Sequence, residues 1–252
     1  MNPEKRPLPV DSKETAHFLA CHTLPIGLKR DAAHKPDQVV ARATFSLIEI
    51  GRRHFFVTCA HVLEKLAEIQ AEYPNAQLAA YTTIPYFTEL TGFDLVDSES
   101  KVLDVAIFRW QENRVELPGR FFIPYDQSYL ADPAINEPVC IVGYPGDIVE
   151  VGPQREDLSY LQVIFPVSSV SDRHIVLADE SGQRKFRDEL YPEQTGINLG
   201  GLSGSAAYVL RNHRYRFLGI VKECHEDDHT ILISRLGCLT PNGTIDRLRM
   251  PY

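Results

Sequence analysis

The chain has 252 residues, of which 44% are hydrophobic and 24% charged, and its formal net charge is −8. This is the composition of an ordinary globular protein and excludes a disordered or fibrous chain. The acidic balance and the lack of a Lys/Arg cluster argue against nucleic acid as a partner. No apolar run approaches the roughly 18 residues of a membrane span, and the first residues lack the apolar core of a secretory signal. We therefore expect a cytoplasmic protein with neither nucleic-acid nor membrane partners.

The first part of the chain predicts an extension, a hairpin and a helix. Residues 1–35 hold several prolines and little periodicity, so we expect an N-terminal extension that lies over the rest or is mobile. The apolar, β-branched stretches 39–50 and 54–58 flank a Gly-Arg-Arg turn and predict a β-hairpin. Between residues 62 and 73 the apolar side chains follow a helical spacing that Pro74 closes, which predicts a helix.

The rest of the chain predicts short strands. They are expected at 77–85, 101–110, 139–144, 161–167, 174–177, 206–210, 216–222 and 230–234. Regularly spaced strands of this length are typical of antiparallel barrels. Turn residues at 117–120 and 132–133 mark a crossing between two halves, so we expect one β-barrel over 36–125 and another over 126–252.

Three stretches contain residues suited to acyl transfer. Ser203 lies between glycines, which permit the tight backbone and the close N–H donors that a nucleophilic hydroxyl needs. His61 ends an apolar run and can act as the base, while Asp104 opens another apolar run and can orient the imidazole. Asp94 and Asp97 are the alternatives for the acid, but both lie in a polar, turn-like stretch.

The order of these residues separates serine-hydrolase families. The α/β-hydrolases run serine, acid, histidine and have glycine two residues after the nucleophile, where this chain has Ser205. Here the order is His61, Asp104, Ser203, with intervals of 43 and 99 residues. Each interval is long enough to hold several strands.

With these residues the chain resembles the trypsin-like (chymotrypsin-fold) serine peptidases, of an intracellular bacterial type. Five motifs carry the resemblance: Thr58-Cys-Ala-His61, Asp104-Val-Ala-Ile107, Val139-Cys-Ile-Val-Gly-Tyr-Pro145, Gly201-Leu-Ser203-Gly-Ser205 and Phe217-Leu-Gly-Ile-Val-Lys222. The resemblance implies an all-β fold of two antiparallel six-stranded barrels with the active site between them and a short helix after the catalytic histidine. It also implies a triad of His61, Asp104 and Ser203, an oxyanion hole from the N–H groups of Gly201 and Ser203, and no cofactor.

The resemblance further places residues in the substrate cleft. Ile197 would form the floor of the specificity pocket, and Lys222, Glu223 and Cys224 would line the cleft. An apolar floor cannot pair a buried arginine or lysine, so we expect no preference for basic residues. Leu202 stands where secreted relatives carry an aspartate, so activation by a freed amino terminus is not expected.

The cysteines and histidines admit other interpretations. The chain has five cysteines, which is an odd number, and they are not spaced in pairs. This predicts reduced thiols in a reducing cytosol. Val62, where secreted relatives carry a bridged cysteine, agrees with this. The stretch 224–229 has one cysteine and two histidines, which is short of a zinc set, so we expect no metal. Cys59 is expected to point into the barrel core.

These observations predict a serine endopeptidase that acts on a protein or peptide substrate. Because an unrestrained protease would harm its own cell, we expect narrow specificity or control by a regulatory partner, in a signalling or defence pathway. Two alternatives remain open at this stage. One is an inactive barrel that binds a peptide without cutting it, and the other is an esterase or thioesterase that uses the same triad.

Overall fold

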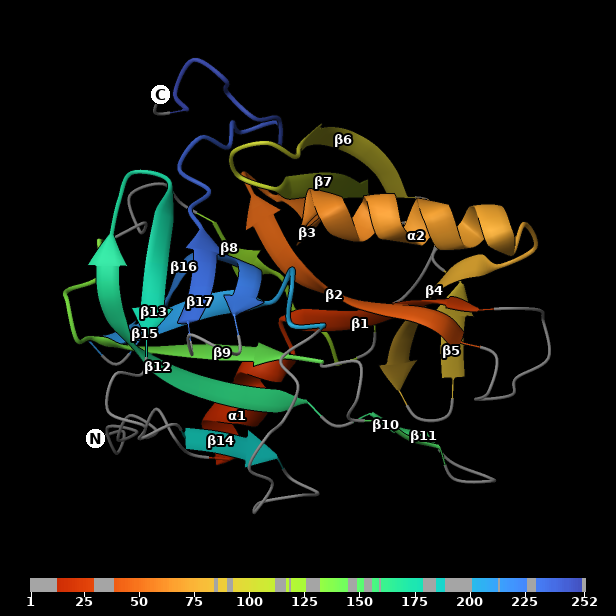
Figure 1. Ribbon diagram of the computed structural model, residues 1–252, viewed down its shortest axis with the longest axis horizontal. Coiled ribbons are helices and arrows are strands. Elements are labelled where there is room, and N and C mark those ends of the chain that lie inside the picture. Colours follow the sequence, from red (N-terminus) through yellow and green to blue (C-terminus); the bar gives the residue numbers. More distant parts are fainter. Residues whose placement is uncertain are drawn as a thin grey trace.

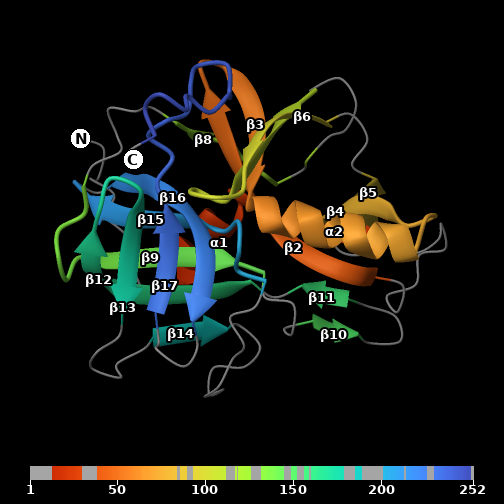
Figure 2. The same ribbon diagram turned by 45° about the horizontal axis from the view of Figure 1, so that its top comes forward.

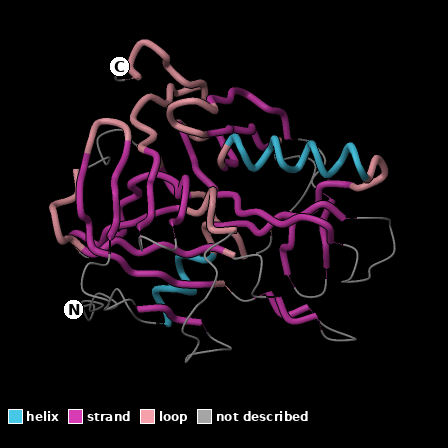
Figure 3. Tube along the Cα trace, viewed as in Figure 1, coloured by secondary structure: helices cyan, strands magenta, loops and turns pink. Residues whose placement is uncertain are grey.

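The computed structural model describes residues 13–29, 39–83, 86–89, 93–111, 117, 119–125, 132–144, 149–151, 156–158, 160–178, 185–188, 201–212, 214–225 and 230–250. Within these residues the protein is mostly β, with two large sheets, a small two-stranded sheet and two helices (Figure 1). The predicted all-β class is therefore confirmed. The strands dominate the trace in Figure 3, and the helices are confined to two short stretches.

The first sheet is a curled half-barrel. Its strands follow the order β5-β4-β1-β2-β3-β7-β6. Their bounds are β1 (Thr23–Lys29), β2 (Val39–Ile50), β3 (Arg53–Thr58), β4 (Gln77–Thr83), β5 (Tyr86–Glu89), β6 (Phe93–Glu99) and β7 (Val105–Trp110). A short strand, β8 (Ile123–Pro124), pairs with β2 in parallel.

The prediction of a closed, wholly antiparallel first barrel is thus wrong for the described residues. The hairpin of β4 and β5 extends one end of the sheet, while β6 extends the other end through β7. No strand pairing joins these two ends among the described residues. The stretch that holds Asp94 and Asp97 was expected to be turn-like, but it is the strand β6.

Part of the expected N-terminal extension is a strand inside the first sheet. After α1 (Lys13–Ala20), β1 pairs with β2 on one side and β4 on the other. The expectation that residues 1–35 lie outside the barrel is therefore wrong for β1. Leu24, Ile26 and Leu28 alternate along this strand and are at most 2% exposed. This period of two is a strand signal, which Pro25 and Gly27 obscured in the sequence.

The second large sheet closes into a barrel. Six strands follow one another as β13-β17-β16-β15-β9-β12, and β12 pairs again with β13. Their bounds are β9 (Pro138–Gly143), β12 (Leu161–Val170), β13 (His174–Ala178), β15 (Ala206–Arg211), β16 (Arg214–His225) and β17 (Thr230–Ser234). β14 (Lys185–Asp188) pairs with β12, and β10 (Val149–Val151) pairs with β11 (Glu156–Leu158) in the small sheet. This confirms the six-stranded antiparallel barrel predicted for the second half.

Two hydrophobic cores hold the halves together. Along β9 the side chains of Val139 and Ile141 belong to the core inside the closed barrel. Cys140 and Val142 point the opposite way and join the larger core, which is filled mainly by the first sheet. A strand presents alternate residues to opposite faces, so β9 is buried on both sides and ties the two units together.

The predicted helix is confirmed as α2 (Ala60–Glu72), which lies beside the first sheet (Figures 1 and 2). It begins two residues earlier than expected, directly after β3. Val62 and Leu66 are buried against the sheet, whereas the opposite face of the helix is exposed. In the described residues, neither α1 nor α2 has the length and apolar content that crossing a membrane would require.

Candidate active site

The first sheet brings His61 and Asp104 together. His61 lies in the first turn of α2, which follows the end of β3. Asp104 directly precedes β7, and β3 and β7 are antiparallel neighbours in which Thr58 pairs with Ala106. In an antiparallel pair the end of one strand lies beside the start of the other. The two residues are therefore neighbours in space although 43 positions separate them.

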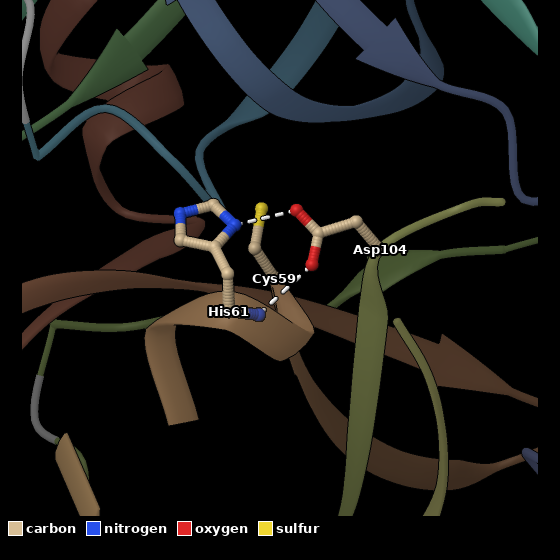
Figure 4. Close-up of side chains that lie close together, drawn as sticks. All are labelled: Cys59, His61 and Asp104. Atoms are coloured by element: carbon tan, nitrogen blue, oxygen red, sulfur yellow. Dashed lines mark hydrogen bonds and ion pairs between the residues drawn. The ribbon is translucent and has the colours of Figure 1, made fainter. Parts of the chain in front are cut away.

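Asp104 binds His61 through both carboxylate oxygens (Figure 4). Oδ1 accepts the backbone N–H of His61 at 2.9 Å, and Oδ2 lies 2.5 Å from Nδ1 of the ring. Asp104 is only 4% exposed, whereas the imidazole is 44% exposed. An ionised carboxylate can only accept, so Nδ1 carries the hydrogen and Nε2 of the neutral ring keeps its lone pair.

The environment of Asp104 favours its charged form. Burial alone would raise the pKa of this carboxyl, but the hydrogen bonds from His61, its attraction to His61 and the nearby Lys222 ammonium bring the pKa below its ordinary value. The backbone of Asp104 has φ 54°, in the left-handed region. Aspartate is one of the few residues with a side chain that adopt this region readily, so the bend before β7 suits this residue type.

The loop before Asp104 is fixed by residues that the sequence reasoning missed. The carboxylate of Glu99 accepts the N–H groups of Val102 and Leu103 at 2.6 to 3.1 Å. Ser234, in the closed barrel, donates its hydroxyl to the carbonyl of Leu103. The contacts of Glu99 could have been anticipated, because its partners follow three and four residues later, as in a local turn. The contact of Ser234 with Leu103 leaves no sign in the sequence, because 131 positions separate the two residues.

Two side chains from the closed barrel lie within hydrogen-bond distance of the carbonyl oxygen of Val102. Nζ of Lys222 on β16 lies 3.4 Å from it, and Nε2 of His174 on β13 lies 3.1 Å from it. Burial lowers the pKa of His174, and the Lys222 ammonium lowers it further, against the raising effect of the Val102 bond. His174 therefore favours its neutral form, which can donate a single N–H to this carbonyl.

The loop of Ser203 is anchored to both sheets. From β2, Thr44 donates to the carbonyl of Gly201 at 3.1 Å and Ser46 donates to that of Gly204 at 2.6 Å. The N–H of Gly204 binds the carbonyl of Val221 on β16 at 2.9 Å. These contacts fix the loop between the half-barrel and the closed barrel.

Gly204 cannot be replaced without moving this loop. Its φ is +88°, and a Cβ here would lie 2.2 Å from the carbonyl oxygen of Thr44 and 2.4 Å from Oγ1 of Thr58. Gly201 also has a positive φ of 95°. The glycines around Ser203 thus meet a steric requirement as well as a conformational one.

Ser203 lies beside Lys222 on β16. Its hydroxyl donates to the carbonyl of Lys222 at 3.3 Å. The thiol of Cys59, two residues before His61, lies 3.9 Å from the same carbonyl. Ser203 and Cys59 therefore lie beside the same residue of β16, and the Ser203 hydroxyl is bound to backbone.

The competing aspartates have other partners. Asp97 forms an ion pair with Arg247 at 2.8 Å and accepts the N–H of Ile245. Asp94 accepts a hydrogen bond from Gln111. Of the three aspartates considered, Asp104 is the one that contacts His61.

The predicted cleft residues are described in part. Ile197 lies outside the described residues. Lys222 turns its ammonium toward the loop before Asp104, as stated above, while Glu223 is exposed and pairs with His225 at 3.3 Å. Cys224 is partly buried against the core of the closed barrel. Their role in binding a substrate stays a prediction.

Cys59 lies in the larger core, as expected, and is fully buried. Its thiol donates to the carbonyl of Val221 at 3.0 Å. Burial, followed by the charge of Asp104, raises the pKa of this thiol well above its ordinary value. The thiol is therefore protonated at neutral pH and is a poor nucleophile.

No protein-family model matches the chain, and no curated protein is detectably similar in sequence. Among solved structures, the chain is similar to one chain of a structure described as "Aromatic interactions drive the coupled folding and binding of the intrinsically disordered Sesbania mosaic virus VPg protein". The two share 11% identity over 84% of this chain and 85% of that chain, with a TM-score of 0.44. A likeness at this level carries no argument about family or function.

Proposed function

We propose that the protein is a trypsin-like serine endopeptidase with the chymotrypsin arrangement, in which Ser203, His61 and Asp104 form the catalytic triad. The observation that carries the proposal is the buried Asp104 carboxylate bound to Nδ1 of a half-exposed His61. The glycine-flanked Ser203 supports it, because its hydroxyl binds the carbonyl of Lys222 that the Cys59 thiol, two residues before His61, also approaches. A buried acid, a base whose second nitrogen is available and a hydroxyl from a separate loop are the groups that acyl transfer needs.

The reaction starts when the Ser203 hydroxyl turns from the carbonyl of Lys222 to Nε2 of His61. Oγ attacks the carbonyl carbon of the peptide bond while Nε2 takes its proton, and Asp104 stabilises the imidazolium that forms. The same proton then passes to the leaving amine as the C–N bond breaks, which leaves an acyl-enzyme on Ser203. Water attacks this ester with His61 as base. The acid product is then released and the free hydroxyl of Ser203 is restored.

The charge that develops on the substrate oxygen needs donors close to Ser203. We assign this role to the N–H groups of Gly201 and Ser203, since the positive φ of Gly201 gives the backbone a turn that side-chain residues rarely adopt. The bonds from Thr44 and Ser46 to the neighbouring carbonyls support the orientation of this loop. Loss of one such donor typically lowers turnover roughly 100- to 1,000-fold.

The proposal is tested by covalent labelling. A fluorophosphonate should label the wild type at Ser203, and Ser203→Ala should abolish labelling and peptide cleavage. Ser205→Ala is the matched control, because Ser205 is fully buried and its hydroxyl has no hydrogen-bond partner among the described residues. Labelling that persists in Ser203→Ala, or that Ser205→Ala removes equally in a folded protein, would overturn the assignment.

A second candidate is a barrel that binds a peptide without cleaving it. The observation in its favour is that the Ser203 hydroxyl is bonded to the carbonyl of Lys222. Peptide binding without any fluorophosphonate labelling or ester turnover would select this alternative. Fast ester turnover without cleavage of folded or denatured protein would instead indicate an esterase.

We further propose a reducing compartment and a regulated activity. All five cysteines lie in the described part of the chain, and none forms a disulfide. Leu202 is fully buried in the core of the closed barrel and offers no acceptor for a freed terminal ammonium. Control would therefore come from narrow specificity or from a protein partner. Unrestricted degradation of casein by the purified protein would contradict this part of the proposal.

A further inference from the structure

Three side chains able to ligate a metal meet at the start of α2. The thiol of Cys59, Nδ1 of His61 and the carboxylate of Asp104 each offer one ligand atom, and these atoms all lie within 4.8 Å of one another (Figure 4). Thiolate sulfur, imidazole nitrogen and carboxylate oxygen are the three donor types that Zn²⁺ takes in proteins. Cys59 has no part in the proposed triad, so this cluster shares two residues with the triad and differs from it in the third.

We propose that Cys59, His61 and Asp104 form an inhibitory site for a thiophilic divalent cation of the Zn²⁺ class. Binding at this site does not depend on the proposed function. The inhibition does depend on it, because the ion occupies two members of the triad.

Charge and protons balance in the bound state. The Cys59 thiol loses its proton to solvent, and the hydrogen on Nδ1 of neutral His61 is replaced by one on Nε2 as the metal takes Nδ1. One thiolate and one carboxylate then neutralise the two positive charges of the ion, with imidazole as the neutral third ligand. One proton is released for each ion bound, and water takes the fourth position of a tetrahedral site.

The required rearrangement is small: the bond between Nδ1 and Oδ2 is lost, and the second contact between Asp104 and His61 is kept. Nδ1 and Oδ2 now lie 2.5 Å apart with a hydrogen between them. On one Zn²⁺ they would lie roughly 3.3 Å apart, given bonds of about 2.0 to 2.1 Å. Oδ1 of Asp104 can keep the backbone N–H of His61. The half-exposed imidazole is the side from which the ion can enter.

Burial and the charge of Asp104 keep the Cys59 thiol protonated, so the ion itself has to displace this proton. The carbonyl of Val221, which the thiol binds now, also accepts the N–H of Gly204 at 2.9 Å and so keeps a donor. Cys59 is the N-cap of α2, where the helix dipole favours an anion. Lys222 opposes the ion, because its ammonium lies at the loop before Asp104.

The bound ion would stop catalysis by a definite route. With the metal on Nδ1, the ring carries its hydrogen on Nε2 and cannot accept the Ser203 proton. Asp104 is engaged by the ion and cannot stabilise an imidazolium. A chelator should restore activity fully, since no covalent bond within the protein changes.

Binding is tested with Co²⁺ as a spectroscopic probe for Zn²⁺, on the full chain carrying Ser203→Ala so that catalysis is irrelevant. A thiolate-to-cobalt absorption band in the near ultraviolet is expected at one ion per chain, with displacement by Zn²⁺. The band should disappear in Cys59→Ala and in Cys59→Ser, which keeps the side-chain size and a donor for Val221. It should persist in Cys224→Ala, the matched control at a neighbouring thiol.

Inhibition is tested on the labelling rate of the otherwise unaltered chain. Loss of an outer-shell partner weakens metal sites roughly 10- to 100-fold, so loss of the Cys59 ligand should raise the Zn²⁺ inhibition constant at least that much. Lys222→Met should lower this constant. Absence of the cobalt band, a band unchanged in Cys59→Ala, or a band lost only in Cys224→Ala would overturn the site. A cobalt band in a chain that never labels would instead refute the proposed function and leave the site standing.

Discussion

Replacing Asp104 by asparagine separates the charge of this side chain from its shape. Asparagine also adopts left-handed backbone, so the φ of 54° is tolerated. Its amide oxygen can still accept the backbone N–H of His61, now bound at 2.9 Å. Its NH2 group can only donate, so the bond from Nδ1–H to the charged carboxylate is lost. The amide donates to Nδ1 instead, and the ring takes the tautomer with hydrogen on Nε2.

The size of the effect follows from these contacts. A hydrogen bond to a charged group contributes about 1.5 to 3 kcal/mol, and each 1.36 kcal/mol corresponds to a tenfold change in rate. The lost bond alone therefore predicts a fall of roughly 10- to 200-fold. The wrong tautomer removes the base as well, and the equivalent change in a serine peptidase with this triad costs about 10,000-fold. We expect a fall of about 1,000- to 10,000-fold in labelling rate and turnover.

The assay compares labelling rates, together with urea unfolding at several pH values. The folded pKa of Asp104 is lowered, so its charged form contributes stability above the unfolded pKa, about 4, and this contribution is lost as pH falls through the folded pKa. The difference in unfolding free energy between wild type and Asp104→Asn should therefore be constant at neutral pH and shrink below about pH 4.

Asp97→Asn is the control for this comparison. Asp97 pairs with Arg247 and not with His61, so its loss should lower stability slightly and leave the labelling rate unchanged. The reasoning is refuted if Asp104→Asn stays within tenfold of wild type, or if Asp97→Asn loses activity equally while Asp104→Asn does not.

Two further predictions concern the loops around the site. Gly204→Ala should lower the free energy of unfolding by about 2 to 4 kcal/mol, since its Cβ meets the carbonyl of Thr44 at 2.2 Å as well as a positive φ. Gly119→Ala, with φ +72° and nothing within 4 Å, should cost only about 1 kcal/mol in the same urea titration, and equal losses would contradict the steric argument. Lys222→Met should raise the pKa of Asp104 and lower kcat several-fold with KM unchanged, while Lys222→Arg restores kcat. A rise in KM alone would instead support the substrate-binding role that the sequence predicted.

Elements whose signal is local could be predicted from the amino-acid sequence alone. The short β-rich runs at residues 139–144 and 230–234, each bounded by turn residues, predicted strands that the closed barrel contains. The spacing of apolar residues from 62 to 73 predicted α2, because a helix repeats its buried face within a few residues. The candidate residues could also be identified in the sequence, since His61 ends an apolar run, Asp104 opens one and Ser203 lies between glycines.

Contacts between distant segments were decided by the tertiary structure. The strand β1 gave a weak signal of its own, and its place between β2 and β4 depends on partners up to 54 residues away, as in the pairing of Ile26 with Ala80. Periodicity says which face of a strand is buried, but not which strand it pairs with or whether a sheet closes. For the same reason the open half-barrel could not be told from a closed one.

The same limit applies to the site. The sequence placed Cys59 in the core, and it did so correctly, but it could not show that the thiol also lies beside Asp104. It predicted Lys222 in a substrate cleft, but it could not show that the ammonium of this residue contacts the carbonyl of Val102, 120 residues earlier. Residue types and their order express what a side chain can do chemically, while distances across two packed sheets arise only when the hydrophobic faces of those sheets are buried together.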